Sequence, residues 1–416
     1  MQNAPKNLRL HIGIFGRRNV GKSSLLNAVT RQNVSIVSDV AGTTTDPVEK
    51  PMELLPLGPV LFIDTAGLDD EGLLGDLRIQ RTRQVFEHVD VGIVVTAAGE
   101  WGDFERELVL ELRLRAIPVI AVFNKKDLGK PSDFILLELK ELGVHVEQTC
   151  IPTLEGIDKV RQALIKAAPE EFVTSPTIAA DLILPGECVV LVIPIDKEAP
   201  RGRLVMPQVQ TIRDLLDNDA WCLVVKEREL REALSRLNRP PALVITDSQA
   251  FLKVAADTPD SVPMTSFSIL FARFLGDLAE MVRGAMAIDT LKAGDRILIL
   301  ESCTHRPIGE DIGTIKIPRW LTQYVGGKLE FTHVTGHDFT TADLSGYKLA
   351  IHCGGCMSNR REVLSRIARC KDAGLPITNY GLTIAFSLGI FERALGPFPG
   401  ARQLYESEKL KVNSEQ

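Results

Sequence analysis

The chain has 416 residues, of which 45% are apolar and 25% charged, and its formal net charge is −6. This composition is typical of a soluble globular protein, and the length predicts two to four domains. No dense block of Lys and Arg offers a footprint for RNA or DNA. No segment resembles a secretory signal or is apolar for long enough to cross a membrane. We therefore expect a cytoplasmic protein with neither nucleic-acid nor membrane partners.

The first 168 residues alternate short β-rich runs with helix-like stretches. This alternation predicts a parallel sheet flanked by helices in a domain over residues 8–168. The expected strands are Leu10–Phe15, Val60–Ile63, Val91–Val95 and Val119–Phe123, and the expected helices are Lys22–Thr30, Leu77–Glu87 and Glu105–Arg115.

The segment 169–176 carries two prolines and breaks the pattern, as a linker does. Two smaller α/β domains are expected beyond it, over residues 178–262 and 263–402. The second contains a long amphipathic helix, Phe267–Met286. Its expected strands are Arg296–Leu300, Leu329–Val334, Lys348–His352 and Pro376–Asn379.

A glycine-rich loop follows the first expected strand and opens the first expected helix, which is the context of a phosphate-binding P-loop. Its backbone amides would face the phosphates, Lys22 would reach the β and γ oxygens, and Ser23 would bind Mg²⁺. The residues expected to contact nucleotide here are Gly16, Asn19, Val20, Gly21, Lys22, Ser23 and Ser24.

Two further segments complete a catalytic set for nucleotide hydrolysis, and a third selects the base. Asp64 and Gly67 are expected near Mg²⁺ and the γ-phosphate, and Thr44 as a second hydroxyl on Mg²⁺. In the sequence Asn124-Lys125-Lys-Asp127, the carboxylate can accept hydrogen bonds that guanine offers and adenine does not. We therefore expect GTP as the nucleotide. A fifth element is represented weakly by Thr149-Cys150.

These motifs and their spacing resemble the TrmE-Era-EngA group of GTPases over about the first 165 residues. Leu68 stands where Ras-like proteins carry a water-orienting Gln, and an apolar side chain cannot orient water. In the group this departure accompanies a potassium ion bound by an Asn at the position of Asn19. The resemblance thus implies slow, potassium-stimulated GTP hydrolysis.

Seven cysteines, an odd number, argue against a disulfide framework. Four of them lie in apolar strand-like runs or a helical pattern and are expected to be small buried side chains: Cys150, Cys188, Cys222 and Cys370.

The other three cysteines form a metal-type pattern with two histidines: Cys303 and His305, then His352, Cys353 and Cys356. Both groups follow expected strands, and the carboxyl ends of parallel strands share one crevice. Three thiolates fit an iron–sulfur cluster, with a histidine or an outside group as the fourth ligand. Of the two histidines, His352 is slightly favoured over His305 because its backbone adjoins Cys353. A zinc site that includes His305 would satisfy the same residues.

The two motif sets together resemble the HydF family, the maturation GTPases of FeFe-hydrogenase, over nearly the whole chain. The 46 residues between His305 and His352 suit that family. The resemblance implies a 4Fe–4S cluster on the three cysteines, a dimerising middle domain with possible higher oligomers, and radical-SAM maturation partners. It also implies transfer of a diiron subcluster precursor to apo-hydrogenase.

Another class of function remains open on the residues: an RNA-modification or ribosome-associated GTPase with a structural zinc site. The acidic charge balance disfavours it.

Overall fold

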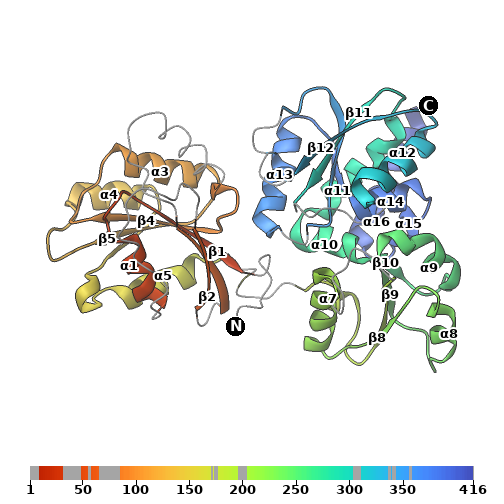
Figure 1. The fold of residues 1–416 in the computed structure, drawn as a ribbon, viewed down its shortest axis with the longest axis horizontal. Helices are drawn as coiled ribbons and strands as arrows, with labels where there is room; N and C mark the ends of the chain where they lie inside the picture. Colours follow the sequence, from red (N-terminus) through yellow and green to blue (C-terminus); the bar gives the residue numbers. More distant parts are fainter. Residues whose placement is uncertain are drawn as a thin grey trace. The chain divides into compact units, whose positions relative to one another are not determined.

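The structure, a computed structural model, divides into two compact units, residues 1–176 and 177–416, which are treated separately (Figure 1). It describes residues 9–30, 48–54, 58–64, 85–169, 172, 177–194, 204–302, 311–335, 339, 343–355 and 358–415.

The first unit is a six-stranded sheet in the order β2-β3-β1-β4-β5-β6. The antiparallel edge strand β2 departs from the expected parallel pattern, and the other strands pair in parallel. Its elements are β1 (Leu10–Phe15), α1 (Lys22–Thr30), β2 (Val48–Leu54), β3 (Gly58–Asp64), β4 (Val91–Ala97), α3 (Asp103–Leu114), β5 (Val119–Asn124), α4 (Asp133–Glu141), β6 (His145–Gln148) and α5 (Ile157–Ala167).

Helices cover both faces of this sheet (Figure 1). Helices α1 and α5 pack on one face and α3 and α4 on the other, each over its own apolar cluster. The central strands β1, β4 and β5 are almost continuously buried, as strands covered on both faces must be. Their carboxyl ends therefore share one edge, where the loops of the nucleotide motifs begin.

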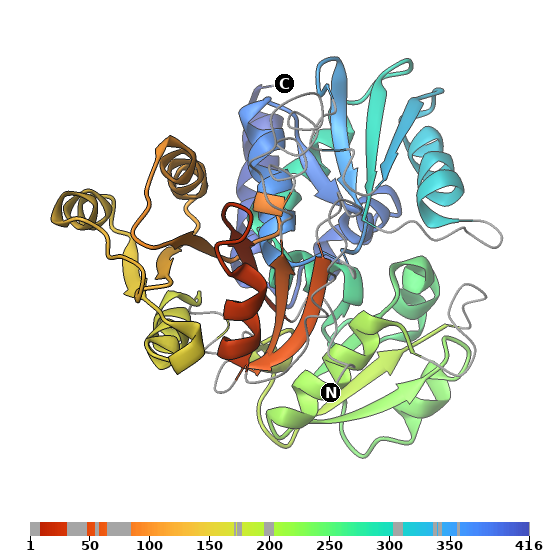
Figure 2. The ribbon, with the colours of Figure 1, turned by 60° about the vertical axis from the view of Figure 1, so that its left-hand side comes forward.

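The second unit contains two four-stranded parallel sheets, in the orders β10-β9-β7-β8 and β12-β11-β13-β14 (Figure 2). Its first elements are β7 (Cys188–Val192), α7 (Met206–Asp217), β8 (Trp221–Val225), α8 (Leu230–Ser235), β9 (Leu243–Thr246), α9 (Phe251–Asp257) and β10 (Met264–Ser266). Those that follow are α10 (Phe267–Leu275), α11 (Leu278–Met286), β11 (Arg296–Glu301), α12 (Ile317–Val325), β12 (Glu330–Thr335), β13 (Tyr347–His352), α13 (Arg360–Asp372), β14 (Ile377–Asn379), α14 (Tyr380–Ser387), α15 (Phe391–Ala394) and α16 (Pro399–Glu415).

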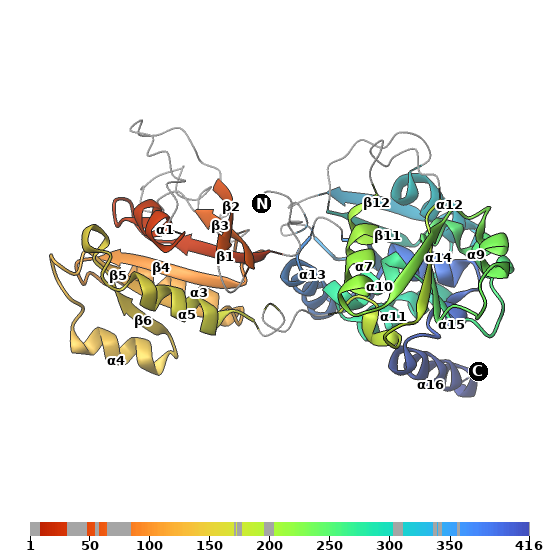
Figure 3. The ribbon, with the colours of Figure 1, turned by 90° about the horizontal axis from the view of Figure 1, so that it is seen from below.

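One apolar core runs through both sheets of this unit. Helix α10 contacts α7 beside the first sheet and α13 and β14 of the second, so it joins the two. The C-terminal helix α16 packs on α11 (Figure 3).

The expected single helix over Phe267–Met286 is wrong, because the chain breaks at Gly276. The Gly276 backbone is extended and ends α10, and the Asp277 side chain accepts a hydrogen bond from the Glu280 amide to begin α11. An Asp that caps a new helix competes with continuation of the old one.

The α/β class, the parallel-type sheet and the P-loop context of the first unit are confirmed. The division of the second unit near residue 262 stays a prediction. None of the helices within the described ranges combines the length and apolar character that crossing a bilayer requires.

Candidate functional site

The P-loop of the first unit curls tightly between β1 and α1. Gly16 and Gly21 have positive φ angles of 142° and 95°. A Cβ at Gly16 would lie 2.2 Å from the Val95 carbonyl oxygen, and one at Gly21 would lie 2.3 Å from Asn124 Nδ2. The loop therefore requires glycine at both positions. Lys22 Nζ lies inside the curl and donates to the carbonyl oxygens of Gly16 and Arg17, both at 2.7 Å.

Asp64, the last residue of β3, places its carboxylate beside the first turn of α1. Ser23 Oγ lies 3.3 Å from Asp64 Oδ2, as expected for two groups that share a Mg²⁺ shell. Burial raises the pKa of Asp64, and the charges of Lys22 and Lys50 oppose that shift. Of the four predicted catalytic residues, Lys22 and Asp64 come together here, whereas Thr44 and Gly67 lie outside the described residues.

The base-selecting loop after β5 is tied directly to the P-loop. Asn124 Nδ2 donates to the Val20 carbonyl at 2.9 Å, and Lys125 Nζ to the Asn19 carbonyl at 2.9 Å. The residue expected to select guanine, Asp127, is exposed beside this junction. The predicted phosphate-binding and base-selecting loops thus contact each other at one edge of the sheet.

The weak fifth element, Thr149-Cys150, lies against the same loop. Thr149 Oγ1 donates to Asn124 Oδ1 at 3.1 Å, and Cys150 Sγ to Asp127 Oδ1 at 3.4 Å. Sequence reasoning missed an ion pair that anchors the P-loop to α3, between Arg17 and the buried Glu105 at 2.8 Å. The sequence carries no signal for this pair, because the burial of Glu105 in the first turn of α3 is visible only in the structure.

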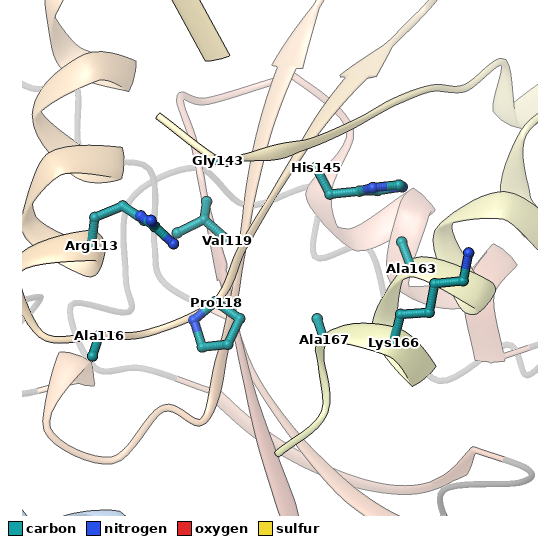
Figure 4. Close-up of a pocket in the computed structure, with 9 residues that line it drawn as sticks. All are labelled: Arg113, Ala116, Pro118, Val119, Gly143, His145, Ala163, Lys166 and Ala167. Carbon is teal, nitrogen blue, oxygen red and sulfur yellow. The ribbon is translucent and has the colours of Figure 1, made fainter. Parts of the chain in front are cut away.

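A separate hollow of about 410 Å³ lies at the opposite end of this sheet (Figure 4). Pro118 and Val119 line it where β5 begins and His145 where β6 begins, and Arg113 and Lys166 contribute cationic side chains. Because the nucleotide motifs gather at the carboxyl ends of the strands, this hollow is distinct from the nucleotide site.

In the second unit, the carboxyl ends of β11 and β13 lie side by side, with Leu300 paired to His352. The Cys353 amide donates to the Leu300 carbonyl at 2.9 Å. Cys353 Sγ lies 3.3 Å from the Ser302 amide nitrogen and 3.5 Å from Ser302 Oγ. The sulfur of a predicted ligand thus accepts a hydrogen bond from the Ser302 amide and, as a thiol, donates to the Ser302 hydroxyl.

Both ring nitrogens of His352, the residue before Cys353, have hydrogen-bond partners. Its Nδ1 lies 2.7 Å from the Cys353 carbonyl oxygen, and its Nε2 lies 2.8 Å from Arg366 Nη1. Because Arg donates only, Nε2 must accept and Nδ1 must carry the proton. Burial and the nearby Arg366 lower the pKa of His352 to about 4, so the ring is neutral.

Other predicted cluster ligands, Cys303, His305 and Cys356, lie outside the described residues. Within the described part of the chain, no three His, Cys, Asp or Glu side chains come together as a metal site. Tyr380 also lies at this end of the sheet, and its hydroxyl donates to Glu301 Oε1 at 2.9 Å. Burial raises the Tyr380 pKa well above its usual value, so the phenol keeps its proton.

Comparisons with known proteins agree with this arrangement. Residues 11–125 match the model described as 50S ribosome-binding GTPase. Over 158 residues the chain is 39% identical to the tRNA modification GTPase MnmE of Chromobacterium violaceum, covering 38% of this chain and 34% of that protein. The corresponding protein of Nostoc sp. is 30% identical over 245 residues, 58% of this chain and 49% of the relative. GTPase Der of Wolinella succinogenes is 38% identical over 176 residues, 40% of this chain and 37% of the relative.

The chain spans between a third and a half of the length of these curated relatives. The first unit is a P-loop GTPase domain. The second unit matches two models peculiar to one family, the hydrogen maturase F dimerization domain over residues 178–276 and the tetramerization domain over residues 279–397. The chain belongs to the hydrogen maturase F family.

Proposed function

We propose that this protein is a cytoplasmic GTPase and iron–sulfur scaffold in the maturation of FeFe-hydrogenase. One observation carries the proposal: a braced guanine-nucleotide site and a cysteine at the shared ends of two parallel strands occur in one chain, in separate compact units. The scaffold would hold a 4Fe–4S cluster, receive a diiron subcluster precursor from radical-SAM partners and transfer it to apo-hydrogenase.

For GTP hydrolysis, Lys22 would bind the β and γ oxygens, and Ser23 with Thr44 would bind Mg²⁺. Asp64 would hold the Mg²⁺ shell, supported by its contact with Ser23. The Gly67 amide would contact the γ-phosphate. Potassium beside Asn19 would supply the positive charge that an arginine finger supplies elsewhere.

The cysteine edge fits a 4Fe–4S cluster in its donor chemistry. The Ser302 amide already points at Cys353 Sγ, as amides do toward cluster sulfur. Gly355, with a φ of 69°, allows the chain to turn immediately before Cys356. Cys303, Cys353 and Cys356 would hold three irons, and the bound cluster would supply an anionic, electron-accepting surface to the precursor.

The fourth iron would take His305, His352 or an incoming group. The partners of His352 favour His305 or an incoming group, because Nε2 accepts from Arg366 and Nδ1–H donates to the Cys353 carbonyl. A position without a fixed side chain would suit a protein that must release its cargo.

The segment 178–262 would provide the dimer contact. The edge strand β8 and the neighbouring α7 expose large apolar side chains, including Trp221, Val224, Val209 and Leu216. A second copy that covers them would yield a homodimer. Light scattering of the intact chain with GDP tests this, since a monomer at micromolar concentration would refute the contact.

The first experiment is to purify the protein anaerobically, reconstitute it with iron and sulfide, and assay iron, sulfide and zinc. The proposal predicts a brown protein with matched iron and sulfide that depends on Cys303, Cys353 and Cys356. A colourless protein that holds zinc and takes up no cluster would instead support the RNA-modification GTPase.

A further inference from the structure

Arg366 occupies an unusual position in the second unit. Helix α13 buries a stripe formed by Val363, Arg366, Ile367 and Cys370, so an Arg takes the place of an apolar side chain. The whole residue is only 4% exposed. Burial of a charge is costly, and replacing a buried ion pair with apolar side chains often leaves a protein equally stable. A role in packing alone therefore does not explain this arginine.

The contacts of Arg366 join the two strand ends that lead to the cysteines. Nη1 donates to Ser302 Oγ at 2.9 Å and to His352 Nε2 at 2.8 Å. Ser302 precedes Cys303, and His352 precedes Cys353. One nitrogen of one side chain thus links the residues before two predicted cluster ligands.

The hydrogen bonds that Ser302 accepts would polarise its hydroxyl group toward a Cys353 thiolate. Ser302 Oγ accepts from Arg366, lies 2.7 Å from Ser358 Oγ and 3.5 Å from Cys353 Sγ. As a thiol, Cys353 donates to Ser302 Oγ, whereas a thiolate bound to a cluster can only accept. Because Ser302 Oγ accepts from both Arg366 and Ser358, its own proton would then be left for the thiolate. The positive charge of Arg366 strengthens that donation.

The carboxylate of Glu362 partly offsets the positive charge of Arg366. Glu362 Oε1 lies 2.6 Å from Arg366 Nη2, one helical turn away on α13. The two side chains are 5% and 12% exposed, so water screens their fields weakly. Changing either residue would alter the local charge by one unit, in opposite directions.

We propose that Arg366 is a positioning residue of the cluster site: it aligns the strand ends that carry Cys303 and Cys353, and its charge, moderated by Glu362, raises the cluster's reduction potential. This inference rests on the proposed iron–sulfur function. The same contact holds His352 Nε2 away from iron, so His352 acts as a brace for the strand end.

The test compares reconstituted wild type with Arg366→Met, Arg366→Lys and Glu362→Gln. EPR-monitored redox titration measures the midpoint potential, chelator challenge measures iron loss, and thermal melting of the apo forms controls for folding. Arg366→Met should lower the potential and lose iron about ten-fold faster or more. Glu362→Gln should raise the potential. Arg366→Lys keeps the charge but not the fork, so it should hold a near wild-type potential and lose iron faster.

Potentials that stay at the wild-type value in both Arg366→Met and Glu362→Gln would overturn the inference, as would shifts of the same sign. If Arg366→Met takes up no cluster or fails to fold, Glu362→Gln decides: a raised potential supports the role and an unchanged or lowered one refutes it. A wild type that binds no cluster would overturn the proposed function, and the inference with it. Those results are distinguishable because only the last concerns the unaltered chain.

Discussion

The nucleotide site and the cysteine edge occupy the same place in their sheets, at the carboxyl ends of parallel strands, but they are assembled differently. The P-loop would bind phosphate with backbone groups, which one short segment that includes Gly16 and Gly21 can position. The cysteine edge depends on side chains from three separate segments, as Ser302, Cys353 and Arg366 show. A backbone-built site leaves a motif in the sequence, whereas a side-chain network leaves only scattered residues.

The largest expected effect separates the two sites. Lys22→Ala removes the cation inside the P-loop and should lower GTP hydrolysis by about 10²–10³-fold, as loss of a preorganised donor does. Phosphate release measures it, with Lys130→Ala as the control for an exposed lysine of the same unit. Iron and sulfide content should stay at the wild-type level. Hydrolysis at the control rate would refute the P-loop role of Lys22.

The next effect concerns the base. Asp127→Asn exchanges an acceptor for a donor beside the junction of the two nucleotide loops. Loss of charge-assisted hydrogen bonds of about 1.5–3 kcal/mol should weaken GDP binding by roughly ten- to hundred-fold and strengthen xanthosine diphosphate binding. Titration with both nucleotides checks this. An unchanged preference for guanine would mean that Asp127 does not contact the base.

A packing change in the second unit tests whether the units are independent. A Cβ at Gly284 in α11 would lie 1.8 Å from the Ile377 carbonyl oxygen in β14. Gly284→Ala should therefore destabilise this unit by about 1–3 kcal/mol, as overpacking does. Gly400→Ala, where a Cβ meets nothing within 4 Å, is the matched control. Calorimetry should show the loss in one transition only, and GDP binding should persist. If Gly284→Ala also abolished GDP binding by the first unit, the two units would fold together.

The smallest effect concerns the monovalent cation. Replacing sodium with potassium at matched ionic strength should stimulate wild-type GTP hydrolysis, and Asn19→Ala should reduce that stimulation. Lys125 holds the Asn19 carbonyl in both forms, but Asn19 has a positive φ of 62° that Ala adopts less readily, so GDP affinity at the wild-type level is the control for an intact loop. Equal rates in both salts would leave Asn19 without a role in potassium binding.

The sequence predicts most strands of the two units because buried parallel strands give strong apolar runs, whereas helices such as α4, α5 and α12 were not predicted. Strand β1 and helix α1 match their expected bounds. The break at Gly276 was missed because the apolar periodicity continues across it, and a single Asp cap outweighs that pattern only in the folded chain. The antiparallel strand β2 was not predicted, because the direction of a strand depends on the connection that leads into it and not on its own residues.

The residues of the two candidate sites likewise divide into those that sequence motifs predict and those that only the folded structure identifies. Lys22, Asn124 and Asp127 were identified from motifs, and the structure brings their loops together. Arg366 and Ser302 belong to no motif and were not predicted, because the burial of Arg366 in the apolar stripe of α13 and its contact with Ser302 are visible only in the folded chain. A network of this kind becomes visible when tertiary packing brings its members together.

The central proposal, a GTPase that delivers a metal cargo to hydrogenase, is tested most directly by activation of apo-hydrogenase. Protein loaded with cluster and precursor by its radical-SAM partners is incubated with apo-hydrogenase, and hydrogen evolution is measured for wild type and Cys353→Ala. We predict activation by the wild type and none by the variant. Equal activation by both, or none by a wild type shown to carry cluster, would contradict the proposal.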